Sequence, residues 1–517
     1  MTDLRDDRPL WGIAEVLKLS WPAGLSMLTG TTMRFVDGLM VSWLSPEPFA
    51  AQFMGGMAAF VFESFILGTL TATTTYVSQN LGAGRPERCG EYARAGLLLA
   101  AALAVLCLPL VFVSRPLFAL IGHAPRVQAY EAMYFRYMIA AIFIGQSAIA
   151  LQRFFYGVHH PRIVLAVAVI ANAFNVLCNY VLIFGKLGFP ALGLEGAAIG
   201  TIAGITLQLG ILAAVFLGPK MHGRFATRRA QVSLVQCREI LRVGWPAGLQ
   251  FCNDLLSWGL MASVLVGMFG TEHLAAHTAA IRYMGLSFMP AVGIGIAATA
   301  LVGKYIGQGR PDLARRRAHA ALVLGVTYMG ACALGLFLLR HPLIGFFVTV
   351  APTANVSAAD ALARADQVVR IGARIMICAA LFQVFDAMAI VYVGALRGAG
   401  DTRWPMVVTF LLSWAVIAGG GGLAVCIAPE LTSLGPWIAA SAYVIVLGII
   451  LARRFESGAW EKIDLLGKRP IPDAEFAALT PEPRESLAVD PPDPPAEVVP
   501  DGRGKYDTPL HDDPSQE

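Results

Sequence analysis

Charged residues are scarce in this sequence, since Asp, Glu, Lys and Arg make up only 14% of the 517 residues. The chain is also 56% hydrophobic and has a mean hydropathy of +0.62, more apolar surface than one soluble core can bury. The formal net charge of +4 is small, and nothing argues for nucleic acid as a partner. The composition therefore predicts a protein whose solvent is the lipid bilayer.

The motifs of most enzymes are also missing. The eight cysteines form no CxxC pair and no Cys/His cluster, and the chain contains no DDxxD, HExxH, GxSxG or GxxxxGK[ST] pattern. We therefore expect no enzymatic activity and no cofactor. The first 18 residues lack a short apolar core followed by a cleavage site, so no cleaved signal peptide is expected.

What the chain does have is a series of apolar segments close to the ~20 residues that cross the hydrocarbon layer. Short polar connections separate them. The sequence predicts an all-α polytopic membrane protein with twelve spans, at 19–44, 50–81, 96–113, 130–157, 163–184, 192–217, 240–269, 274–303, 319–339, 368–396, 406–427 and 437–453.

The sequence repeats itself about 225 positions apart: "WPAGL" at 21–25 returns at 245–249, and "GAGRPE" at 82–87 returns as "GQGRPD" at 307–312. Six spans fall in each half, so the two halves should cross the membrane in the same direction, related by a pseudo-twofold axis along the membrane normal. We expect an N-terminal segment (1–18), a six-helix lobe (19–218), a basic linker (219–239), a second six-helix lobe (240–454) and a tail (455–517).

The loop charges predict the orientation. Most arginines and lysines lie in loops on one side of the membrane. Because basic loops stay on the cytoplasmic side, we expect a protein of the cell (inner) membrane whose two termini are both cytoplasmic. The tail is rich in proline and acids from about residue 469 and is expected to be largely disordered. The other set of loops carries only Arg115, Arg126, Lys186, Arg340 and Arg364.

Ionisable residues inside spans are costly, so each needs an explanation. Asp254 follows Gln250 by one helical turn, and Asp386 follows Gln383 by three residues, so each acid shares a helix face with an amide. Two carboxylates and two amide oxygens would suit Na+, whereas desolvated carboxylates could instead carry protons. The structural alternative is that each acid pairs with an arginine of a neighbouring span and only stabilises the packing of the helices.

A second polar group lies in the first two spans. Arg34 precedes Asp37 on the same helix face, and Glu63 lies in the next span at a depth that could reach it. A guanidinium beside Asp37 favours its charged form and weakens its case as a proton carrier. Asn175 and Asn179, one turn apart, could bond between helices or complete a polar site with Asp37.

Two further polar residues lie in the eighth span. Arg282 could be the counter-ion of an acid, or it could face a central cavity and repel cations. His277 lies near the start of this span, where a lone histidine is more often a packed hydrogen-bonding residue than a ligand.

Four segments together resemble the multidrug and toxic compound extrusion (MATE) family: "RFVDG" in the first span, "VSQNLGAG" closing the second, "AAHTAA" opening the eighth and "GALRGAGDTRWP" after the tenth. The segment 174–201 also resembles the family. The likeness covers nearly all of residues 15–455 and is nearest to the bacterial NorM-like branch.

The resemblance implies an antiporter that exports cationic or amphipathic organic compounds in exchange for inward Na+ or H+. Asp37 and Asn175 match the polar site of the N-terminal lobe, and Asp254 and Asp386 match the cation site of the C-terminal lobe. Phe382 stands where some relatives have tyrosine, so its ring could still face a cation but a hydroxyl ligand is lost. Arg34, Glu63 and Arg282 stand where neutral residues are expected.

We therefore expect alternating access between two lobes, with a small organic substrate, a coupling cation and the lipid bilayer as partners, in a protein that acts as a monomer. A flippase for a lipid-linked or anionic amphipathic substrate is the alternative, because Arg34 and Arg282 would suit a pyrophosphate group. A major facilitator transporter is disfavoured, since its GxxxDRxGRR-like loop is absent.

Overall fold

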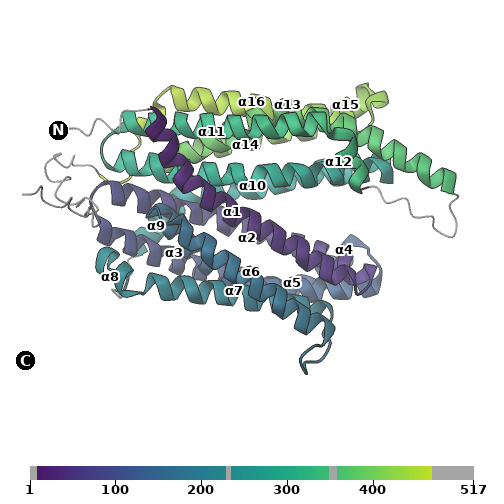
Figure 1. Ribbon diagram of the computed structural model, residues 1–517, viewed down its shortest axis with the longest axis horizontal. Helices are drawn as coiled ribbons and strands as arrows, with labels where there is room; N and C mark the ends of the chain where they lie inside the picture. The colour runs from purple at the N-terminus through teal and green to yellow at the C-terminus, as the bar shows by residue number, and fades with distance from the viewer. Residues whose placement is uncertain (1–8, 229–233, 348–357, 468–517) are drawn as a thin grey trace, which may run out of the picture. The chain divides into compact units, whose positions relative to one another are not determined.

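The structure, a computed structural model, describes residues 9–228, 234–347 and 358–467 (Figure 1). These residues belong to one compact unit, Met1–Ile471, whereas Pro472–Glu517, with nearly all of the expected disordered tail, lies outside the described residues. No strand occurs in the described ranges. The N-terminal half contains α1 (Pro9–Ser42), α2 (Pro46–Gly82), α3 (Pro86–Cys107), α4 (Leu110–Ile121), α5 (Pro125–Gly157), α6 (Pro161–Phe184), α7 (Leu194–Phe216) and α8 (Pro219–Phe225).

The C-terminal half is also helical. Two of its helices continue into π-helical segments, α9 into Met261–Val266 and α14 into Ser413–Gly420. The half contains α9 (Leu234–Leu260), α10 (Thr271–Gly307), α11 (Pro311–Leu338), α12 (Arg340–Phe347), α13 (Ala358–Ala399), α14 (Arg403–Leu412), α15 (Gly421–Ile427) and α16 (Leu434–Glu456).

Proline determines where many of these helices begin. Its fixed φ suits the first helical turn, where its missing N–H costs nothing. The prolines that begin helices in this way are Pro46, Pro86, Pro125, Pro161, Pro219 and Pro311.

The predicted membrane protein is confirmed, because eleven of the described helices are long and apolar enough to cross a membrane. The first predicted span lies in α1, a continuous helix that is not among the eleven; its threonines, Arg34 and Asp37 make it more polar than the others. The third predicted span, 96–113, is wrong at its end. The helix stops at Cys107, and α4 begins at Leu110 after Pro109, because proline cannot continue the hydrogen-bond ladder of a preceding turn.

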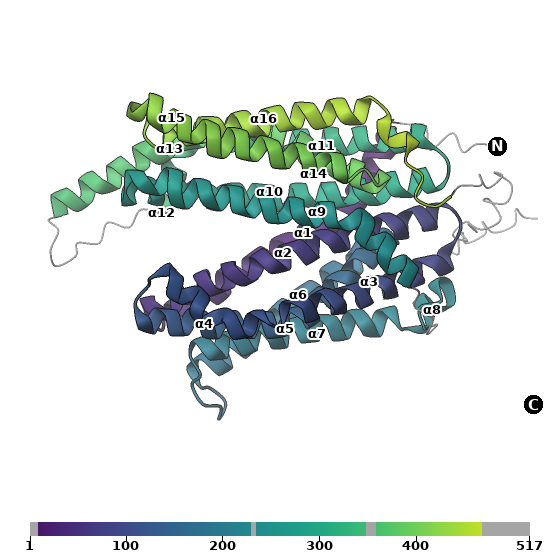
Figure 2. The ribbon, with the colours of Figure 1, turned by 180° about the vertical axis from the view of Figure 1, so that it is seen from behind.

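Each half packs its own helices, but the first helix of each half begins on the other half. Helix α1 packs first on α10 and α11 and then on α6, whereas α9 packs first on α2 and α3 and then on α14. In Figure 1, α1 runs from the group that contains α10 and α11 to the group that contains α6 and α7; Figure 2 shows the corresponding course of α9. The two halves are therefore joined by an exchange of helices.

Glycine permits the closest approaches in this exchange. A Cβ on Gly68 of α2 would lie 2.6 Å from the carbonyl oxygen of Ala247 on α9, and a Cβ on Gly293 of α10 would lie 2.3 Å from the backbone nitrogen of Gly24 on α1. Gly68 and Gly293 are 225 positions apart, which is the period of the sequence repeat. The duplicated sequence thus builds two equivalent helix crossings.

Contacts between the halves gather at one end, which we call the base: the end at which the glycine-rich turns of residues 82–86 and 307–311 lie. Gly84 and Gly309 have φ values of +67° and +74°, so the predicted tight turns are present at equivalent positions. Near them, the side-chain amide of Gln79 donates to the Gly398 carbonyl at 2.9 Å, and the Thr75 hydroxyl donates to the Arg397 carbonyl at 2.9 Å.

Candidate functional site

In the N-terminal half, Asp37 of α1 lies at the centre of a polar group contributed by three helices. Asn179 of α6 donates its Nδ2–H to Asp37 Oδ1 at 2.6 Å, and the Thr201 hydroxyl of α7 lies 3.5 Å from Oδ2. Asn179 also lies 3.4 Å from Asn175 Oδ1, and both asparagines are fully buried. The structure therefore brings Asp37, Asn175 and Asn179 together, and it adds Thr201, which we did not predict.

Small residues on α7 create the space for these amides. A Cβ on Gly200 would lie 2.0 Å from Asn179 Oδ1, and a Cβ on Gly204 would lie 2.7 Å from Asn175 Cβ. Asn179 Oδ1 and Asn175 Nδ2 are buried without a hydrogen-bond partner among the described groups. This polar group thus has capacity for a further donor and acceptor, such as water or a substrate group.

Arg34 lies beside this group but is not directly paired with it. Its guanidinium is exposed and reaches the Thr31 hydroxyl at 3.5 Å, while Glu63 and Asp37 lie within electrostatic reach of its charge. Within the described ranges, no direct ion pair joins Arg34 to either acid. The predicted cluster of Arg34, Asp37 and Glu63 is therefore a loose electrostatic grouping.

In the C-terminal half, Asp254 of α9 and Asp386 of α13 lie close enough for their charges to interact. Asp254 Oδ1 is buried and has no hydrogen-bond partner in the described part of the chain. Arg397, eleven residues beyond Asp386 on α13, is within electrostatic reach of Asp254, and its guanidinium stacks over the Phe251 ring at 5.3 Å. Two acids and one arginine from two helices thus share the interior of this half.

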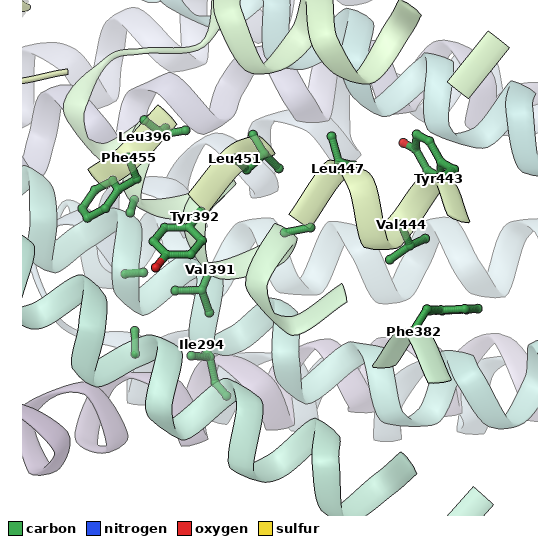
Figure 3. Packing of buried hydrophobic residues seen from close by; sticks show 14 of the residues in the cluster. Ile294, Phe382, Val391, Tyr392, Leu396, Tyr443, Val444, Leu447, Leu451 and Phe455 are labelled. Carbon is green, nitrogen blue, oxygen red and sulfur yellow. The ribbon is translucent and has the colours of Figure 1, made fainter. Parts of the chain in front are cut away.

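Tyr443 of α16 is a second group that we did not predict. Its hydroxyl-bearing ring is 3% exposed and lies within electrostatic reach of both Asp254 and Asp386. Figure 3 shows Tyr443 among the buried side chains of the C-terminal half, in the same view as Phe382 of α13. A hydroxyl therefore lies near the carboxylates although Phe382 itself offers none.

The two amides predicted to accompany these acids are bonded to hydroxyls of neighbouring helices. Gln250 Nε2 donates to the Thr409 hydroxyl of α14 at 3.2 Å, and Gln383 Nε2 donates to the Ser287 hydroxyl of α10 at 2.7 Å. These bonds fix the nitrogen ends of both amides. A role for the amide oxygens as cation ligands stays a prediction.

Aromatic rings line the same region. The Trp258 ring lies 6.5 Å from Phe382 and 6.3 Å from Trp437, and the His277 ring lies 5.3 Å from Trp437. His277 is 5% exposed, as expected for a packed histidine, but its Nδ1 is a buried atom without a partner among the described residues. These rings form an aromatic cluster one helical turn from Asp254 and Asp386 on α9 and α13.

Arg282 is exposed on α10, and its guanidinium lies 6.0 Å from the centroid of the Phe347 ring of α12. In the described part of the chain, no carboxylate pairs with it. Of the two alternatives left open by the sequence, the structure therefore favours an arginine that faces open space over a counter-ion of an internal acid.

The arrangement can bind a single hard cation or a proton. The buried, unpaired oxygen of Asp254 and the second carboxylate of Asp386 are donors that Na+ accepts, and either carboxylate could be protonated. The described residues contain no group of three or more His, Cys, Asp or Glu side chains that could hold a metal ion.

Comparison with known proteins shows the family. The sequence model of the MatE family matches residues 22–181 and 246–418. A "Probable multidrug resistance protein NorM" of Mesorhizobium japonicum is 30% identical over 86% of this chain and 93% of its own length, and a "Multidrug resistance protein NorM" of Burkholderia vietnamiensis is 28% identical over 85% and 93%.

Solved structures show the same fold. A transporter of the MOP superfamily from Pyrococcus furiosus, whose description reports a reversed polarity of its binding pocket, superimposes with a TM-score of 0.78 at 20% identity, over 87% of this chain and 97% of its own. An outward-facing multidrug resistance MATE family transporter superimposes with a TM-score of 0.76, also at 20% identity and with the same coverage. The fold, the spans and the two matched repeats agree, and the chain belongs to the MatE family, the multidrug and toxic compound extrusion transporters.

Proposed function

We propose that this protein exports amphipathic organic compounds in exchange for Na+ or H+ that moves inward, and that Asp254 and Asp386 hold the coupling cation. The observation that carries this proposal is the pair of interacting carboxylates on α9 and α13, one of which has a buried oxygen without a partner. Such an oxygen is stabilised by an incoming cation or proton. Relatives named as multidrug resistance proteins support the substrate class.

Alternating access would use the contacts at the base. With the base closed by the bonds of Thr75 and Gln79 to α13, substrate could leave at the opposite end; opening the base would break these bonds. The cation would bias this exchange, because each charge that crosses the membrane releases about 2.3 kcal/mol per 100 mV. We further propose that the base faces the cytoplasm, as the excess of basic residues in its loops indicates.

The test is substrate efflux from proteoliposomes under Na+ and pH gradients imposed independently. We expect Asp254→Asn and Asp386→Asn each to lower gradient-driven efflux about tenfold or more, because the neutral amide no longer couples the cation to the change of access. The gradient that drives the wild type identifies the cation.

Asp366→Asn is the matched control, since Asp366 lies on α13 with Asp386 but is exposed and pairs with Arg370 one turn away. It should leave efflux unchanged. The proposal would be refuted if wild-type efflux depended on neither gradient. It would also be refuted if Asp254→Asn and Asp386→Asn both retained gradient-driven efflux.

A further inference from the structure

Arg34 and Arg282 lie at similar heights on helices that cross each other. Helices α1 and α10 meet where a Cβ on Gly24 would lie 3.1 Å from Pro290 Cα. Arg34 is ten residues beyond Gly24 and Arg282 is eight residues before Pro290, which places them about 15 Å and 12 Å from the crossing, both away from the base. Figure 1 shows the two helices separating in that direction.

The stripe of α10 that bears Arg282 is largely exposed, with the Phe347 ring of α12 beside the guanidinium. Helix α13 packs on α10 around Gly295 and Thr299, about 140° and 100° around the helix from Arg282. The face that meets α1 at Gly293 is only about 20° away. Residues at four-residue intervals along this stripe are all exposed: Leu274, Thr278, Arg282 and Leu286. Arg282 is therefore exposed on the side of α10 that, nearer the base, meets α1.

Arg282 is also the less compensated of the two cations. Glu63 and Asp37 lie within electrostatic reach of Arg34, whereas Arg282 has only the ring of Phe347 beside it in the parts of the chain that the structure describes. A ring face attracts a guanidinium weakly and leaves its N–H donors free. An arginine inside a membrane span is costly, so an anion from outside the chain would stabilise it.

Depth argues against a lipid headgroup as that anion. Arg282 lies eleven residues into α10, about 16 Å along the helix from Thr271, which is roughly half of the ~30 Å hydrocarbon thickness. Lipid phosphates lie at the surface of the bilayer. A compound bound between the two halves can present its anionic group at this depth.

We propose that Arg282 binds an anionic group, such as a carboxylate, on the exported compound, with the Phe347 ring supporting the guanidinium and Arg34 adding positive potential from the opposite half. The inference rests on the proposed export function and narrows its substrate class: compounds that carry an acidic group are preferred over otherwise identical compounds without one. Asp37 and Glu63, the acids near Arg34, could bind a cationic group on the same compound.

The experiment compares a fluorescent rhodamine dye that has a free carboxylate with its methyl ester, measuring binding by fluorescence anisotropy and efflux from proteoliposomes. The wild type should bind the free acid more tightly. Arg282→Gln should weaken binding of the acid about tenfold while the ester changes by less than about twofold, as expected for one charge-assisted contact. Arg282→Lys should retain part of the preference.

Arg340→Gln is the control, because Arg340 is a partly exposed arginine of α12 whose guanidinium instead stacks on Phe337 at 4.8 Å. This variant should change neither the binding nor the efflux of either dye. Equal effects of Arg282→Gln on both dyes, no effect on either, or a wild-type preference for the free acid that disappears when anionic lipid is omitted from the vesicles would overturn the proposal. If the wild type showed no cation-driven efflux of either dye, that result would instead refute the proposed export function.

Discussion

At the scale of single residues, two glycines decide how the polar group of the N-terminal half is built. Asn179 and Asn175 can lie beside α7 only because Gly200 and Gly204 have no side chains there. The sequence identified the asparagines and Asp37 as candidates, but it could not identify these glycines, since a glycine's role depends on which helix it faces. The same holds for Arg397 of α13, which lies within electrostatic reach of Asp254, and for Tyr443 of α16, which lies within reach of both acids of the C-terminal half.

Gly200→Ala should therefore damage the N-terminal polar group. Its methyl group would displace Asn179, whose amide donates to Asp37, and overpacking of this kind costs about 1–3 kcal/mol. We expect a lower midpoint of thermal unfolding in detergent. Gly210→Ala on the same helix has open space around its Cβ and should be neutral or stabilising by up to about 1 kcal/mol. Equal shifts in the two variants would contradict this explanation.

At the scale of elements, the beginning of α1 is fastened to α10 and α11 by one carboxylate. Glu15, which precedes the first predicted span, accepts hydrogen bonds from Arg317 Nε at 2.7 Å, Lys304 Nζ at 3.2 Å and the Tyr305 hydroxyl at 2.9 Å. Burial acts to raise the pKa of Glu15, but the charges of Lys304 and Arg317 and the hydrogen bonds outweigh it, so the pKa is lowered.

The direction of this pKa shift determines how the stabilisation by Glu15 depends on pH. A carboxyl whose pKa is lowered by folding stabilises the folded state at pH values above its unfolded pKa of about 4.3, and the contribution is lost as pH falls through the folded pKa. The contact should therefore be at full strength from pH 6 to pH 8, roughly, and a pH gradient across the membrane would not open it.

Glu15→Gln should weaken the contact between α1 and the C-terminal half. Arg317 is only 2% exposed and would lose its charged contact with Glu15, and removing one member of a buried pair is strongly destabilising, here by about 2–3 kcal/mol given the partial exposure of Glu15. Thermal unfolding at pH 7 and cross-linking across the base measure this. Glu461→Gln, which removes a half-exposed partner of Arg315, should cost less than about 1 kcal/mol. An equal cost for both would show that Glu15 has no special role.

At the scale of the whole molecule, the orientation of the bundle can be tested with a native cysteine. Cys426 is the exposed cysteine of α15, whereas the other seven are buried or partly buried. Figure 2 shows α15 at the end opposite the base, so it should face outward if the base is cytoplasmic.

A thiol reagent that cannot cross membranes should then label intact cells at one site, and Cys426→Ser should abolish the labelling. Labelling that appears only after the membrane is opened would reverse the proposed orientation.

The sequence by itself determined the all-helical membrane fold, the duplication, the glycine-rich turns and the polar residues of both halves, because hydropathy, periodicity and repeated motifs are local properties. Only the tertiary structure decided that α1 and α9 begin on the opposite half, that the third span ends at Cys107, that Gln250 and Gln383 bond to hydroxyls, and that Arg282 is exposed beside the Phe347 ring. These features depend on which faces of helices meet, and a linear pattern does not contain that information.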